Sequence, residues 1–186
     1  MKATKTEVDS LDKVREHQRT GWKLGTHYDV DFREFLMVAA DLRTLEGKVG
    51  YAEAEEANKL CQELLPVAAH KLDVLGVHIG LWQKNICEKY GEEVLEKLKE
   101  SMIEKHPEGC PTMKDTREAS RKLKSCSECY EKELLIGEAF EDKSFAVRLA
   151  KVMSCSAYVI ELSVEWVSIL IRFVCAQKEG GLYEAV

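Results

Sequence analysis

The chain has 186 residues, of which 45% are hydrophobic and 32% charged, an ordinary balance for a folded globular protein and far from that of a disordered one. Its net charge of −6 argues against a general nucleic-acid binder, because such proteins gain affinity by neutralising phosphates. Seven cysteines, an odd number lying mostly inside helical patterns, favour reduced thiols in a cytoplasmic protein. No apolar leader follows Met1, so we expect no signal peptide.

The sequence predicts two helices in the N-terminal third of the chain. Residues 6–18 carry a thin apolar edge and a capping signal of Thr6 with Asp9, which together predict a short helix. Residues 29–47 repeat apolar side chains at three- and four-residue steps, which predicts one buried helical face. The members of that face are Phe32, Phe35, Leu36, Ala39 and Leu42.

The middle of the chain continues the helical pattern from residue 51 to residue 90. Its first part has one apolar stripe: Ala54, Ala57, Leu60, Cys61, Leu64 and Leu65. Pro66 interrupts it, since proline lacks a backbone donor and clashes with the preceding turn. It either kinks one long helix or begins a second one at its first turn. Residues 92–106 then form an amphipathic segment with Val94, Leu95, Leu98, Met102 and Ile103 expected to face inward.

Two further helices are predicted in the C-terminal part. Residues 112–140 place an apolar stripe at three- and four-residue steps: Ala119, Leu123, Cys126, Tyr130 and Leu134. Residues 144–177 form the longest element, apolar on about two thirds of its circumference. Its polar residues make one stripe, namely Ser154, Tyr158, Glu161, Glu165, Ser168 and Arg172. The ionisable groups on that stripe make a membrane span unlikely to form, so either the other helices or a second copy of the chain must cover the apolar sides.

A possible zinc site lies between the two halves. His106, Cys110, Cys126 and Cys129 follow one another at a spacing that structural zinc sites adopt. Against zinc, Cys126 belongs to the apolar stripe of residues 112–140, where a reduced cysteine packs as a small hydrophobe. The stripe favours thiols in a core, so we expect no cofactor, and zinc stays the weaker alternative. A haem ligand role for His70 or His78 is a further alternative to plain core histidines.

A basic stripe marks the same helical segment. Its cations recur at steps of three, four and three, on the side opposite the apolar residues: Lys114, Arg117, Arg121 and Lys124. They suit the phosphates of RNA or DNA, or an acidic partner. The competing interpretation is an ordinary solvated face, which the neighbouring Asp115 and Glu118 favour.

These patterns predict an all-α bundle of six or seven helices with a long, mostly buried C-terminal helix. We expect an N-terminal helical subdomain over residues 1–109 and a C-terminal helical hairpin over residues 110–186, or one single domain. No phosphate-binding loop or nucleophile elbow is visible, so we expect no enzyme.

The leading hypothesis is therefore a helical interaction protein that forms homo-oligomers or binds a protein partner. The residues expected at that interface are Trp166, Ile169, Leu170 and Phe173. Nucleic-acid binding by the basic stripe of an oligomer and metal or haem binding are the alternatives.

Overall fold

The computed structural model describes residues 32–48, 54–135 and 143–178, with side chains described over 32–48, 60–128 and 147–177. The predicted helix over residues 6–18 lies outside the described residues. Five helices form the described part: α2 (Phe32–Glu46), α3 (Ala54–Tyr90), α4 (Glu92–Lys105), α5 (Met113–Leu135) and α6 (Lys143–Lys178). The all-α class is confirmed, and the described residues contain five helices, where six or seven were predicted for the chain.

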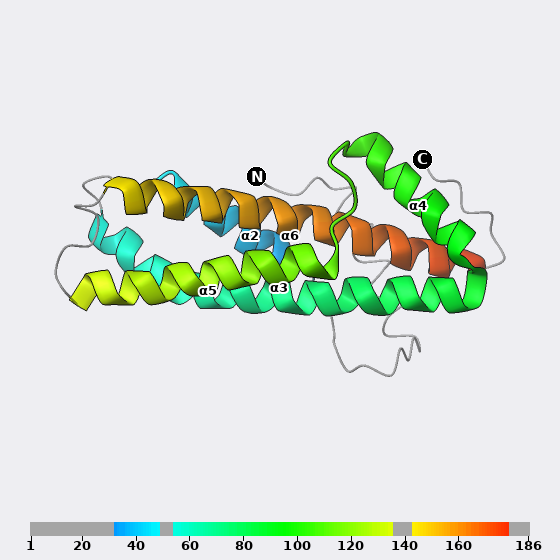
Figure 1. Cartoon of the computed structure of the whole chain (residues 1–186), viewed down its shortest axis with the longest axis horizontal. Coiled ribbons are helices and arrows are strands. Elements are labelled where there is room, and N and C mark those ends of the chain that lie inside the picture. The colour runs from blue at the N-terminus through cyan, green and yellow to red at the C-terminus, as the bar shows by residue number, and fades with distance from the viewer. Residues whose placement is uncertain (1–31, 49–53, 136–142, 179–186) are drawn as a thin grey trace.

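The long helices lie side by side in an elongated bundle (Figure 1). α5 runs in the opposite direction to both α3 and α6. α3 and α6 each pack against both α2 and α5, so α2 and α5 occupy opposite corners of the bundle. One continuous core extends from Phe32 to Cys175 and joins the parts of the chain on either side of residue 110.

α3 passes through Pro66 without ending, so the segment that allowed two helices is one helix. A proline inside a helix leaves the carbonyl four residues earlier without its usual donor. That carbonyl belongs to Gln62, and both Gln62 and Pro66 are exposed, so water can bind the freed oxygen. By length and hydropathy the stretch Leu60–Tyr90 could also cross a membrane, a test that buried core helices of globular proteins satisfy as well.

α6 is unbroken over 36 residues, or about 54 Å at the rise of an α-helix. Its apolar sides are covered by the chain's own helices: Trp166, Leu170 and Val174 have no exposed surface. Most residues of the predicted polar stripe are partly or fully exposed, and Glu161 and Glu165 pair with other parts of the chain. Both Arg43 nitrogens Nε and Nη2 donate to the Glu161 carboxylate, at 2.8 and 2.9 Å.

α5 begins with a reciprocal cap. The Asp115 carboxylate accepts hydrogen bonds from the backbone N–H and the hydroxyl of Thr112, at 2.7 and 2.8 Å, while the Asp115 N–H donates to the Thr112 hydroxyl at 3.2 Å. This arrangement satisfies donors that the first turn of a helix leaves free. The expected apolar stripe holds where its side chains are described, since Ala119 and Leu123 are buried and Cys126 is partly buried.

Candidate functional site

The four residues predicted at an interface are buried inside a single chain. Trp166, Ile169, Leu170 and Phe173 are each less than a tenth exposed. The sequence allowed either the chain's own helices or a second copy to cover this part of α6, and here the chain's own helices cover it. These side chains therefore offer no free apolar surface to a partner.

The three predicted zinc ligands whose side chains the structure describes are not brought together. His106 Nε2 lies 2.7 Å from Glu165 Oε2, and the Cys110 thiol faces the Lys99 carbonyl oxygen at 3.8 Å. Cys126 lies within α5, about 20 Å along the helix axis from Met113. The Cys129 side chain lies outside the described ones. Within the described residues no three His, Cys, Asp or Glu side chains gather as a metal site, and zinc stays a prediction that elemental analysis of the purified chain can check.

Burial shifts the pKa of two thiols and of one histidine. Desolvation raises the pKa of Cys110 to about 11 and that of Cys61 also to about 11, so both thiols stay protonated at neutral pH. Desolvation lowers the pKa of the buried His78 to about 4, and its imidazole stays neutral. His70 is exposed on the same helix, and the haem alternative for these two residues stays a prediction.

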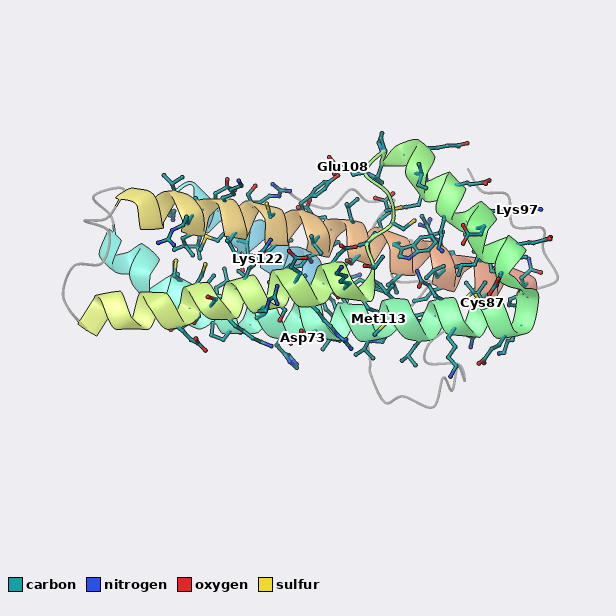
Figure 2. The ribbon with its side chains drawn as sticks, in the orientation of Figure 1. Asp73, Cys87, Lys97, Glu108, Met113 and Lys122 are labelled. Atoms are coloured by element: carbon teal, nitrogen blue, oxygen red, sulfur yellow. The ribbon has the colours of Figure 1, made fainter. Side chains whose placement is uncertain are left out.

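The basic stripe lies on the exposed face of α5. Lys124 donates to Asp73 of α3 at 2.8 Å, so one of the four cations is paired. Lys114, Arg117 and Arg121 are exposed, and no ion pair joins them to the side chains described. Lys122, which points towards α6 in Figure 2, belongs to a different side of the helix and pairs with Glu118 at 3.1 Å.

A groove between α2 and α3 is the surface that the sequence did not predict. Its volume is about 350 Å³. Its lining residues are Val38, Asp41, Thr44 and Leu45 from α2 and Lys48 from the turn after it, with Leu60, Glu63, Leu64 and Val67 from α3. The floor is apolar, because Val38 and Leu45 are buried there.

Large apolar side chains border this groove while remaining exposed to water. Leu60 is 39% exposed and Val67 45% exposed. Met37, 65% exposed, lies one turn before Asp41 on the same side of α2 and extends the apolar surface. Of the six exposed large hydrophobic residues that the structure describes, Leu60 and Val67 line the groove and Met37 lies beside it on α2.

The sequence pattern placed Leu60 and Leu64 in the same stripe as the core residues Cys61 and Leu65. In the structure Cys61 and Leu65 are fully buried, while Leu60 is exposed and Leu64 is partly buried in the groove. Two adjacent apolar pairs make a stripe wider than one helix contact needs. The width of this stripe was the feature of the sequence that could have indicated an exposed apolar surface, although it could not show which member of each pair faces outward.

Comparisons with known proteins identified no relative of this chain. No protein-family model matches the chain, and searches of curated proteins and of solved structures found no significant match.

Proposed function

We propose that the protein is a non-enzymatic interaction protein that binds an α-helix of a partner protein in the α2–α3 groove. The observation that carries the proposal is the exposure of Leu60, Val67 and Met37 around an apolar floor. Leu60, Leu64 and Val67 recur at steps of four and three, so they form a row about two helical turns long. An amphipathic helix binds such a row through apolar side chains one turn apart.

The charges at the rim favour a basic partner helix. Asp41 and Glu63 are exposed acids on opposite sides of the groove, with Lys48 as the one base among the lining residues. The chain as a whole carries a net charge of −6. Lysine or arginine flanking the apolar residues of the partner would complement this rim, whereas a second copy of this acidic chain would meet like charge. We therefore favour a different protein over self-association.

Binding of designed helical peptides tests the proposal. The probes are an 18-residue Leu/Lys amphipathic peptide and its Leu/Glu counterpart, titrated by fluorescence anisotropy. We expect the basic peptide to bind and the acidic one to bind at least tenfold more weakly. Val67→Asp should weaken the basic peptide at least tenfold, because it places a charge in the apolar row.

Ile103→Asp is the matched control, since Ile103 on α4 is 45% exposed, as Val67 is, but lies outside the groove lining. Its affinity should equal that of the unchanged protein, with circular dichroism confirming that both variants are folded. Equal weakening by both substitutions, or no binding of the basic peptide, refutes the proposal. Light scattering on the same samples reports self-association as a separate outcome.

Nucleic-acid binding by α5 is a second candidate, favoured by the three exposed cations that pair with no described side chain. Its test is anisotropy of a mixed-sequence single-stranded RNA between 50 and 200 mM salt. We expect affinity to fall steeply with salt, and Arg117→Glu with Arg121→Glu to abolish it. Lys97→Glu with Lys105→Glu is the control for the same change in net charge, since both residues are exposed on α4 and Lys97 projects away from the bundle in Figure 2. Affinity that survives the double substitution excludes this candidate.

A further inference from the structure

α4 differs from the other helices in how it joins the bundle. It stands at an angle to the long helices, beside the C-terminal half of α6 (Figure 1). Gly91 begins it at φ +93°, and Gly109 follows it in the loop at φ +96°. A Cβ atom at either glycine would meet nothing within 4 Å, so the backbone conformation, not crowding, calls for glycine at both places.

Three apolar side chains attach α4 to the bundle. Leu95, Leu98 and Met102 are buried, while the rest of the helix surface is largely exposed or partly covered. The helix packs mainly on α3 and to a lesser extent on α6. Its starting point is fixed, because the Tyr90 ring, next to Gly91, packs edge-to-face on Phe173 with centroids 5.2 Å apart.

Two polar contacts hold the other end. His106, the residue that ends α4, lies 2.7 Å from the Glu165 carboxylate of α6. The Glu108 carboxylate faces the Tyr158 hydroxyl, two turns earlier on the same polar stripe of α6, and raises the pKa of Tyr158. Figure 2 shows Glu108 on the loop above α6. Both contacts are partly exposed to water, unlike the apolar contacts among α2, α3, α5 and α6.

We propose that α4 and its loop form a hinged flap, which turns at Gly91 and is latched to α6 by His106 and Glu108. Release of the latch uncovers the apolar surface beneath Leu95, Leu98 and Met102, while α2, α3, α5 and α6 stay packed. Such local opening needs less free energy than global unfolding when few apolar contacts must separate. The inference does not depend on the α2–α3 groove, which contains no residue of α4.

Hydrogen–deuterium exchange followed by mass spectrometry tests the flap. In the unchanged protein we expect amides of residues 95–105 to exchange at least tenfold faster than those of residues 160–174. His106→Ala should speed exchange in α4 a further threefold or more and leave the long helices unchanged. Tyr158→Phe, which removes only the hydroxyl that Glu108 faces, should act in the same direction with less risk to folding.

Arg43→Ala is the matched control, because it breaks a contact to the same polar stripe of α6 from α2 instead of from the flap. It should leave exchange in α4 unchanged. Glu165→Gln, which keeps an oxygen acceptor for His106, should restore slower exchange than Glu165→Ala. Equal exchange of α4 and α6 in the unchanged protein, or acceleration of all helices together by His106→Ala, overturns the proposal.

Discussion

α4 is held in the structure differently from the four helices of the bundle, α2, α3, α5 and α6. α6 buries apolar side chains on several sides against α2, α3 and α5, and its polar stripe needs only a few partners. α4 buries three side chains along one edge and relies on polar contacts at its far end. The difference teaches that stability here is concentrated where helices are covered from several sides, and that a helix covered from one side depends on contacts that water can replace.

Trp166→Ala should give the largest effect, and Ile103→Ala the matched small one. Trp166 has no exposed surface, so its removal leaves a cavity in the bundle and should lower the free energy of unfolding by about 3–5 kcal/mol. Ile103 lies on α4 and is 45% exposed, so its loss should cost no more than about 0.5 kcal/mol. Urea unfolding measures both. Similar losses for the two variants would contradict the contrast between bundle and flap.

Acid should weaken the bundle through His78. Burial lowers the pKa of His78 to about 4, whereas the unfolded chain takes up this proton near the ordinary value of 6.5. Between these pH values the unfolded state binds more protons, so this contribution is complete above about pH 6.5 and is lost as the pH falls towards 4. The loss amounts to roughly 3 kcal/mol.

Urea unfolding at several pH values measures this dependence. His78→Leu should flatten the decline between pH 6.5 and 4, while His70→Gln on the exposed side of α3 should leave it in place. A decline that survives His78→Leu unchanged would show that other groups cause it.

Gly76 in the bundle and Gly91 at the start of α4 require glycine for different reasons. A Cβ atom at Gly76 would overlap the hydroxyl of Thr116, a buried residue of α5 whose Oγ1 donates to the Met113 carbonyl at 2.9 Å. Gly76→Ala should therefore destabilise the protein by about 1–3 kcal/mol, even though alanine favours helix. Gly91→Ala meets no neighbour, but the backbone at φ +93° and ψ 161° lies in a region that is almost confined to glycine, so this substitution should also cost about 1–3 kcal/mol. Thermal unfolding measures both losses, and a variant as stable as the unchanged protein would contradict the account of that glycine.

The sequence predicted where the helices lie along the chain better than it predicted which helices contact one another. The long C-terminal helix was expected over residues 144–177 and spans Lys143–Lys178, because its pattern is strong and uninterrupted. Its polar stripe was also visible, but the partners of Glu161 and Glu165 were not. Arg43 lies 118 positions from Glu161, and no local pattern reports which helices meet across such a separation.

The groove between α2 and α3 was not predicted, because it too depends on how separate helices meet. Leu60 looked like a core residue because its spacing fits the core stripe, and its exposure depends on where α2 lies against α3. The zinc prediction also depended on spacing along the chain. That spacing made His106 and Cys126 candidates for one site, but about 20 Å of continuous helix separates Cys126 from Met113 at the start of α5, and zinc binding stays a prediction.

The Arg43–Glu161 pair should give the smallest effect. Its geometry is bidentate, yet the two side chains are 42% and 37% exposed, so water and salt screen the attraction. A double-mutant cycle of Arg43→Ala and Glu161→Ala, measured by urea unfolding, should yield a coupling of about 0.5–1 kcal/mol that decreases in 1 M KCl. The same cycle for His106 and Glu165 should appear in α4 exchange and hardly in global unfolding, because opening the flap precedes unfolding of the bundle. A coupling above about 2 kcal/mol for Arg43 and Glu161 would mean that polar contacts, and not coverage from several sides, hold α2 on α6.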